Sequence, residues 1–355
     1  MSLPTNSECS ATRLLCSSLT LPRPAVHVSG KLNQMSSSED QPTAQTQRKD
    51  GRDGGNEGLS NTQEQAGPDD QEPAPKDTSG RPTAAESMSS LSDRYSMNHG
   101  RRGDAVIFVH SEFDNKDLKP RKSASHDASI MKEAFEALGF RAEEHWDLTK
   151  VELLKTLQQV AERDHSDCDS LVLVFMSHGG LRNRNNREYV WAKDTTMDTL
   201  ELWVNFTAER CPKLAGKPKL YFIQACRGDD VDKGVNIRQA PVRGLAVQTD
   251  CHNLVEDYVI PLQADQLVMW ASYPGYPSFR REDEEIQGSV FIHYLANNLK
   301  EYAITSPRPS LASILLKVTR EVAILYESST DPEDIYNKNK QVPYTHSTLL
   351  REVYF

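Results

Sequence analysis

The chain has 355 residues and a formal net charge of −10, from 51 acidic and 41 basic side chains. A protein that binds nucleic acid neutralises phosphates with an excess of lysine and arginine side chains, and this chain has an excess of acidic ones. The charge therefore argues against a nucleic-acid-binding protein. It contains no run of about 18 apolar residues, the length that a membrane-spanning helix needs. We therefore expect neither a nucleic acid nor a membrane as a partner.

The six cysteines show neither a CxxC pair nor the Cys/His spacing of a zinc site. We therefore expect no metal, no cofactor and no disulfide scaffold. Cysteines without such a pattern are typical of a reducing compartment, so the sequence predicts a cytoplasmic protein.

The amino-terminal quarter of the chain differs in composition from the rest. Residues 1–93 lack Phe, Trp and Tyr, and residues 36–93 also lack Ile and Val. Such a segment cannot bury a core, so we expect a disordered leader that ends near Asp93, before the first aromatic residue, Tyr95. The opening stretch is Ser-rich and basic, as transit peptides are; a leader without function and translation from Met35 are the alternatives.

Beyond the leader, apolar runs alternate with amphipathic segments. Strands are predicted at residues 105–109, 140–146, 171–176, 220–223 and 267–271, with a hairpin arm at 189–192. Helices are predicted at 127–138, 197–206, 289–303 and 311–327, and after Thr149, which has Glu152 at capping-box spacing. Strands that alternate with helices indicate an α/β protein with a sheet between two helical layers.

A cysteine follows the predicted strand at 220–223. Cys226 stands in the run Gln-Ala-Cys-Arg-Gly, where the apolar segment ends, and open α/β sheets bind ligands beyond the carboxyl ends of their strands. A free cysteine taken alone more often fills an apolar core position. The strand at 171–176 adds a second observation, because it ends in Ser-His-Gly-Gly and places His178 at a strand end as well.

Cys226 and His178 lie 48 positions apart (226 − 178). If the two strands are parallel neighbours, both side chains reach the same edge of the sheet. A thiolate near neutral pH needs a base or a cation close by, and a histidine supplies either. The pattern therefore predicts a thiol–imidazole pair with Cys226 as the nucleophile.

On these residues the chain from about Tyr95 to Phe355 resembles the caspases, and most of all invertebrate effector caspases. The segments 164–167, 214–220 and 272–276 add to the likeness, in the family's order. The resemblance implies a three-layer α/β/α sandwich around a mostly parallel, six-stranded sheet. It also implies a cysteine-type endopeptidase that cuts proteins after exposed aspartates, is made as a zymogen and carries out apoptotic proteolysis.

The resemblance further implies a leader at 1–93, a large subunit at 94–250 and a small subunit at 251–355, and a homodimer of such heterodimers. We expect autocatalytic processing at Asp250, which ends an extended approach in the polar segment 229–258, and at Asp93. An inhibitor or an upstream activating protease is the further partner that the resemblance implies.

The resemblance also assigns roles around the nucleophile. His178 would protonate the leaving amine, and the backbone N–H groups of Gly179 and Cys226 would bind the oxyanion. An aspartate-specific pocket needs fixed cations, and arginine pairs with a carboxylate through two hydrogen bonds. Arg121 and Arg280, with Gln224 as the third member, match the family's carboxylate clamp. The preceding Ser-Phe favours Arg280 over its neighbour Arg281.

The chain departs from the family's pattern in the subsites further from the cut. Pro277 and Val290 stand where many effector caspases carry aromatic residues. We therefore expect the pocket three residues upstream of the cut aspartate, which includes Phe279 and Val290, to accept a larger or more apolar side chain. Closure of that space by Phe279 or by the loop 281–287 is one alternative, and recruitment of an acidic side chain by Arg281 is another.

Two other functions fit parts of this pattern. A catalytically silent, caspase-like decoy or scaffold would not need Cys226, His178 and the clamp residues together. A related thiol hydrolase that cuts after lysine or asparagine is disfavoured by the arginine pair, which would repel a basic side chain.

Overall fold

We describe the protein from a computed structural model that covers residues 92–182, 187–235, 260–283 and 286–355. The predicted leader up to residue 91 and the predicted processing site Asp250 lie outside these residues. The proposed boundary between large and small subunits therefore stays a prediction.

A six-stranded sheet forms the centre of the fold, with the strand order β11-β8-β7-β3-β1-β2. Four pairs of neighbours are parallel, and β11 at the edge is antiparallel to β8. The predicted fold class is confirmed. The strands are β1 (Arg101–Val109), β2 (Arg141–Trp146), β3 (Cys168–Met176), β7 (Lys219–Gln224), β8 (Gln266–Trp270) and β11 (Tyr344–Ser347).

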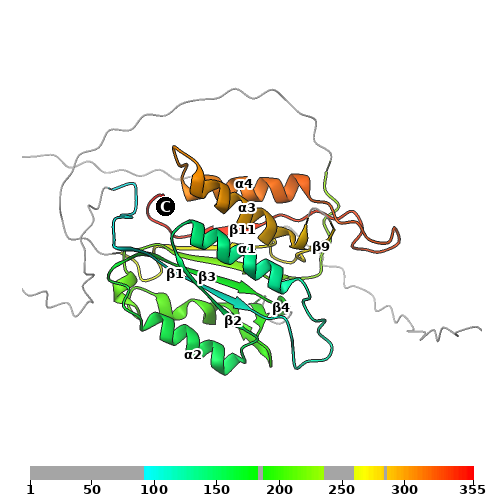
Figure 1. Ribbon diagram of the computed structural model, residues 1–355. Helices are drawn as coiled ribbons and strands as arrows, with labels where there is room; N and C mark the ends of the chain where they lie inside the picture. Colours follow the sequence, from blue (N-terminus) through cyan, green and yellow to red (C-terminus); the bar gives the residue numbers. More distant parts are fainter. Residues whose placement is uncertain (1–91, 183–186, 236–259, 284–285) are drawn as a thin grey trace, which may run out of the picture. The chain divides into compact units, whose positions relative to one another are not determined.

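Helices cover both faces of this sheet (Figure 1). Three helices, α1 (Ala124–Ala137), α3 (Val290–Ile304) and α4 (Leu311–Leu325), lie on one face, and α2 (Lys150–Ala161) lies on the other. Alternate residues of β1 enter two separate apolar cores: Ile107 packs in one and Phe108 in the other. Burial on both faces explains why the central strands are continuous apolar runs.

The α2 helix begins as the sequence predicts. The Thr149 backbone N–H donates to Glu152 Oε2 at 2.9 Å, and the Thr149 side chain accepts from the Glu152 backbone. This reciprocal pairing satisfies two of the donors that a helix start leaves free. No helix among the described residues has the length and apolar character to span a bilayer.

The predicted helix at 197–206 is wrong. The structure has a short strand, β6 (Thr196–Asp198), followed by two 3-10 turns, η1 (Thr199–Leu202) and η2 (Val204–Phe206). Trp203 separates the turns with a φ of −124°, outside the helical range, and its ring lies 5.7 Å from that of Tyr221. Packing of this indole on the sheet overrides the local helical pattern.

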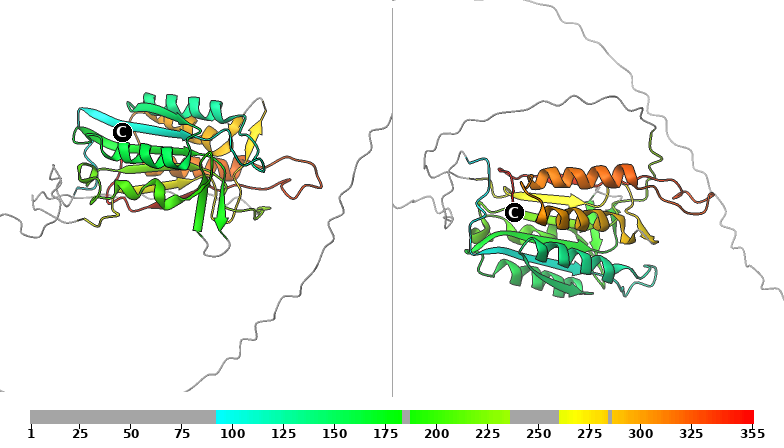
Figure 2. Two further views of the ribbon diagram at one scale, coloured as in Figure 1. Left: turned by 90° about the horizontal axis from the view of Figure 1, so that it is seen from below. Right: turned by 45° about the horizontal axis from the view of Figure 1, so that its top comes forward.

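Smaller elements surround the carboxyl edge of the sheet. The hairpin strands β4 (Gly179–Arg182) and β5 (Arg187–Trp191) form a three-stranded sheet with β6, which stands out from the main sheet in Figure 2. A second ribbon pairs β9 (Arg280–Glu282) with β10 (Gln287–Ser289). A further 3-10 turn, η3 (Pro212–Leu214), precedes β7.

Candidate active site

The strands β3 and β7 are parallel neighbours, as the sequence argument required. Their last register pair is Met176 with Gln224, and the Ser177 backbone N–H donates to Gln224 O at 3.0 Å. His178 and Cys226 therefore follow two adjacent strands at the same edge. Both residues are half-buried, so a substrate can reach them.

The imidazole of His178 is held from two sides. Its Nε2 bonds to the backbone oxygen of Lys119 at 2.8 Å, and its ring centroid lies 5.0 Å from that of the buried Phe113. Because a carbonyl oxygen can only accept, Nε2 carries the proton and the neutral ring keeps its lone pair on Nδ1. Burial, and then the charges of Arg280 and Arg121, lower the pKa of His178 below its ordinary value.

The thiol of Cys226 lies against the loop that follows β8. Its Sγ accepts from the Ser278 backbone N–H at 3.4 Å and lies 3.6 Å from Ser278 Oγ. Gln224 donates from Nε2 to that same hydroxyl at 2.9 Å. Ser278 therefore lies between the predicted nucleophile and a predicted clamp residue, and a substrate bound there would have to share or displace these contacts.

The turn after the nucleophile is fixed by Arg227. Its buried guanidinium pairs with Glu188, donates to Ser272 O at 3.2 Å, and stacks 4.5 Å from the Trp270 ring centroid. The next residue, Gly228, has a φ of +153°, and a Cβ there would lie 2.2 Å from Gly275 O. Only glycine fits this close crossing, so the backbone that carries Cys226 is rigidly placed.

The glycine after His178 also lies in a tight space. A Cβ on Gly179 would come within 2.9 Å of Cys226 O and 2.8 Å of Tyr189 O. The absence of a side chain lets the two backbone segments that carry the proposed oxyanion donors approach each other.

The two arginines of the predicted clamp differ in exposure. Arg121 is buried and donates from one guanidinium nitrogen to His110 O at 3.1 Å, whereas Arg280 is exposed at the start of β9. Burial and the neighbouring charge of Arg280 lower the pKa of Arg121 to about 10, so it stays protonated at neutral pH. The other terminal nitrogen of Arg121 is buried without a hydrogen-bond partner among the described residues. A substrate carboxylate would supply that partner.

Phe279 packs in a cluster of aromatic rings, next in the chain to the predicted clamp residue Arg280. Its ring lies 5.6 Å from that of Tyr326 and 6.4 Å from that of Tyr336, and its backbone N–H donates to Gln341 Oε1 at 2.8 Å. Val290 lies beside Phe279, fully buried at the start of α3, and donates its backbone N–H to Phe279 O at 3.1 Å. Its side chain packs in the core among apolar residues, so it supports Phe279 and presents no surface to a substrate, unlike the pocket residue that the sequence predicted.

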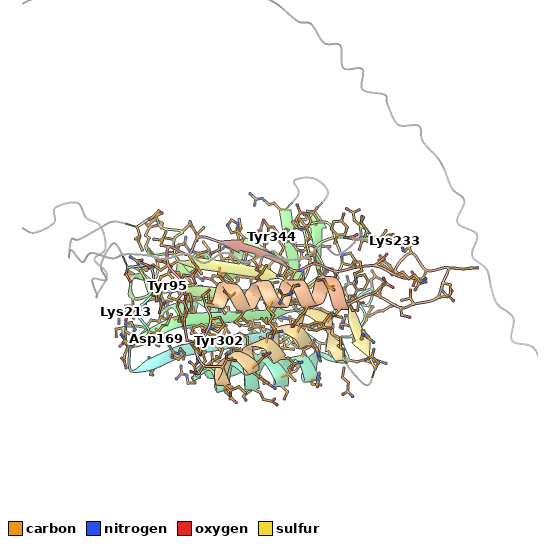
Figure 3. The ribbon with its side chains drawn as sticks, turned by 90° about the horizontal axis from the view of Figure 1, so that it is seen from above. Tyr95, Asp169, Lys213, Lys233, Tyr302 and Tyr344 are labelled. Atoms are coloured by element: carbon orange, nitrogen blue, oxygen red, sulfur yellow. The ribbon has the colours of Figure 1, made fainter. Side chains whose placement is uncertain are left out.

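The segment after the catalytic turn packs on a distant loop, the 328–340 loop. Lys233 donates from Nζ to the backbone oxygens of Ile335 at 3.0 Å and Asn337 at 2.7 Å. In Figure 3, Lys233 and Tyr95 lie at opposite ends of the sheet. The segment that carries Lys233 and the end of the leader therefore lie at opposite edges of the sheet.

Asp93, the second predicted processing site, lies at that other edge. Its side chain is exposed, but its carbonyl accepts from the Glu352 backbone N–H at 2.7 Å, and Tyr95 N–H donates back to Glu352 O at 3.0 Å. A protease that binds its substrate in an extended form has to open this pairing first.

Sequence reasoning missed three residues that shape the site: Ser278, Glu188 and Asp127. Ser278 lies two residues before Arg280 in a loop whose sequence points to Arg280, Phe279 and Pro277, and a serine in such a turn-rich loop carries no signal of its own. Glu188 is one acid among many in a polar hairpin, and no local pattern distinguishes it. Asp127 stands at the start of the predicted amphipathic helix, and a charged residue on a buried helix face is the signal that could have marked it. Among the described residues, no cluster of three His, Cys, Asp or Glu side chains could hold a metal ion.

The sequence model of a protein family, the caspase domain, matches residues 102–354, which is most of the chain. The chain belongs to the caspase family. It is 37% identical over 261 residues to caspase-1 of Spodoptera frugiperda, covering 74% of this chain and 81% of that protein. It is 36% identical to caspase-1 of Drosophila melanogaster, with 74% and 75% of the two chains covered.

A solved structure agrees with this assignment. The crystal structure of caspase-1 from Spodoptera frugiperda superimposes with a TM-score of 0.66 at 34% identity, covering 76% of this chain and 98% of that one. The predicted likeness to invertebrate effector caspases is confirmed. Caspases are cysteine proteases, so the family agrees with the thiol–imidazole arrangement of Cys226 and His178.

Proposed function

We propose that this caspase is an active endopeptidase that cuts proteins after aspartate and is made as a zymogen. The observation that carries the proposal is the buried guanidinium of Arg121, which has one nitrogen without a hydrogen-bond partner among the described residues, close to the edge that carries Cys226 and His178. A decoy has no need to keep a desolvated cation beside an intact thiol–imidazole pair, because such a charge is costly to bury.

The first half of the reaction forms a covalent intermediate. His178 Nδ1 takes the proton of the Cys226 thiol, and the sulfur bonds to the scissile carbonyl carbon while the carbonyl electron pair moves to oxygen. The backbone N–H groups of Gly179 and Cys226 bind that oxyanion; loss of one such donor typically costs about 2.7–4 kcal/mol. When the tetrahedral species collapses, His178 gives its proton to the leaving amine, and an acyl-enzyme remains.

Water completes the cycle. It attacks the thioester carbon while His178 accepts one of its protons, and the proton returns to the sulfur as the carboxylic acid leaves. The Lys119 carbonyl keeps the imidazole in the tautomer that both steps need, because it holds the Nε2 proton.

Aspartate specificity follows from the clamp. Arg121 offers a fixed donor from the interior, Arg280 a second cation from the loop, and Gln224 an amide donor once it releases Ser278. A lysine side chain would meet two like charges, and asparagine would leave them uncompensated. The clamp therefore accepts a short carboxylate.

The biological setting rests on the relatives. Several are named as caspases of insects and vertebrates, including caspase-3 and caspase-7. We infer an intracellular, apoptotic role in the cytoplasm, protein substrates with exposed aspartates, and control by an inhibitor or an upstream protease.

The proposed assembly is a homodimer of large and small subunit heterodimers. β11 lies at the edge of the sheet and has no strand on its outer side among the described residues. Beside it runs a groove of about 670 Å³ that is lined mainly by apolar residues of α4 and the carboxyl-terminal segment, among them Leu311, Leu315, Leu316 and Leu349. A second copy fits an unpaired strand edge with an apolar neighbour.

The test compares hydrolysis of peptides that differ only in the residue before the cut. The recombinant chain should cleave the aspartate peptide and prefer it to the asparagine peptide by orders of magnitude, and Cys226→Ala should abolish cleavage. A processed, folded protein that cleaves neither peptide would support the decoy instead.

A further inference from the structure

A buried carboxylate lies directly behind the clamp. Asp127, in the first turn of α1, is 0% exposed. Its Oδ1 accepts from the Ser289 backbone N–H at 2.9 Å, and its Oδ2 accepts from Ser289 Oγ at 2.5 Å. Since Ser289 caps α3, the carboxylate joins two helices that lie side by side on the same face of the sheet (Figure 1).

The space around this carboxylate is shaped for it. A Cβ on Gly288 would lie 2.2 Å from Asp127 Oδ1, so any side chain there would push the carboxylate away. The hydrogen bonds from Ser289 fix its direction. Burial raises the pKa of Asp127 above its ordinary value, while the Ser289 hydrogen bonds and the charges of Arg121 and Arg280 oppose that rise. A buried acid held in this way needs a cation nearby.

That cation is Arg121. Asp127 Oδ2 lies 3.6 Å from the guanidinium nitrogen of Arg121 that makes no hydrogen bond among the described residues. The distance is an ion pair without a hydrogen bond, so Asp127 attracts the nitrogen but does not occupy its donor. The charge of Arg280 repels the same guanidinium, and Cys226 and Asp147 add weaker attraction.

We propose that Asp127 is a positioning residue of the carboxylate clamp. Asp127 holds Arg121 in place by charge and leaves the N–H donors of the Arg121 nitrogen Nη2 available to the substrate aspartate. This inference rests on the proposed function. A positioning role explains why the carboxylate of Asp127 is hydrogen-bonded to Ser289 and lies 3.6 Å from the guanidinium of Arg121. A direct hydrogen bond would compete with the substrate, whereas no charge at all would leave two arginines to repel each other.

The decisive variant is Asp127→Asn, which keeps the shape and can still accept one of the two hydrogen bonds from Ser289, while its amide NH2 group can donate to the Ser289 hydroxyl. We expect the KM for aspartate peptides to rise about tenfold with kcat within about threefold, because Arg121 loses its alignment while the chemical step is untouched. Ser289→Ala keeps the charge but removes one hydrogen bond, and should raise KM about threefold. The matched control is Asp104→Asn, another buried acid paired with arginines, whose loss should lower the melting temperature without changing KM.

A double-variant cycle separates positioning from mere support of the fold. In an Arg121→Gln background, Asp127→Asn should change the remaining kcat/KM by less than about twofold, since the residue it acts through is gone. An equal loss in both backgrounds, or an unchanged KM in Asp127→Asn, would overturn the proposal. If Asp127→Asn does not fold, Ser289→Ala decides: an unchanged KM there also overturns it.

The same measurements keep this inference apart from the function on which it rests. If the unaltered enzyme does not prefer aspartate, or Arg121→Gln leaves that preference intact, the proposed function fails. If both behave as expected and the Asp127 variant does not, only the positioning role fails.

Discussion

Met176 at the end of β3 pairs with Gln224 at the end of β7, and the histidine and the cysteine each follow two positions later. Because of this parallel register, His178 and Cys226 lie the same number of residues beyond the ends of their two strands. A shift of the register by one residue would have turned one side chain to the opposite face. The pairing of these two strands is thus the feature on which the proposed chemistry depends.

The two arginines of the clamp should differ in what their removal costs. Arg121→Gln leaves His110 O without its donor and the interior without its cation, so both the melting temperature and kcat/KM should fall. Arg280→Gln removes an exposed charge, so kcat/KM should fall with little change in melting temperature. Thermal unfolding and peptide kinetics check both. Equal turnover of aspartate and asparagine peptides by the unaltered enzyme would contradict the clamp.

The proton affinity of His178 should respond to the clamp. In a Cys226→Ala background, NMR should show His178 titrating below pH 6.5, because burial and then the Arg280 and Arg121 charges disfavour the imidazolium. Arg280→Gln removes one positive charge, so the pKa should move upward, towards its ordinary value. Arg210→Gln, an exposed arginine in another loop, is the control and should leave the titration unchanged. A downward move in the Arg280 variant would contradict this account.

Processing should favour one aspartate. Mass spectrometry of the self-processed enzyme should give a small subunit that begins at Cys251, and Asp250→Ala should prevent this cut, with Asp257→Ala in the same segment as the control. The cut at Asp93 should be slower, because its carbonyl is paired with the Glu352 N–H. A small subunit with any other first residue would show that Asp250 is the wrong choice.

The upstream pocket should accept bulky apolar groups. We expect a substrate with an aromatic residue three positions before the aspartate to outperform one with aspartate there by about tenfold, since about 1.4 kcal/mol of extra burial suffices. Val290→Trp should reduce this preference by displacing Phe279, to which Val290 is hydrogen-bonded, and because Val290 is fully buried it should lower the free energy of unfolding by about 1–3 kcal/mol. Val290→Ile is the conservative control. An aspartate preference that the tryptophan leaves unchanged would defeat the assignment.

The proposed dimer face can be tested at one exposed leucine. Leu316 on α4 lines the groove beside β11 and is 68% exposed, so Leu316→Glu should shift the sedimentation of the processed enzyme towards the lower mass and reduce kcat/KM. Val151→Glu changes an exposed apolar residue on α2, across the sheet, and should leave the mass unchanged. Identical sedimentation of both variants would place the interface elsewhere.

The sequence alone predicted five of the six strands of the main sheet and a candidate nucleophile. Strands such as 171–176 are buried on both faces, so their sequences are continuous apolar runs. Such runs can be recognised as strands from the sequence without tertiary information. The Thr149–Glu152 cap was also readable, because the four residues that make it are contiguous. By contrast, β11 carries mostly exposed residues at the sheet edge, and from the residues themselves it gave no strand signal.

Tertiary structure decided what depends on residues distant in the chain. The helical pattern at 197–206 gave way to two short turns, because Trp203 packs on the sheet instead of continuing a helix. The contact of Asp127 with Ser289 spans 162 positions, and its approach to Arg121 depends on how α1 packs against α3. Local propensity acts over a few residues, whereas a buried charge is stable only where separate segments supply its counter-charge and donors. For that reason the sequence could point to Cys226 and the two arginines as candidates, but only the fold could show that Asp127 lies 3.6 Å from Arg121.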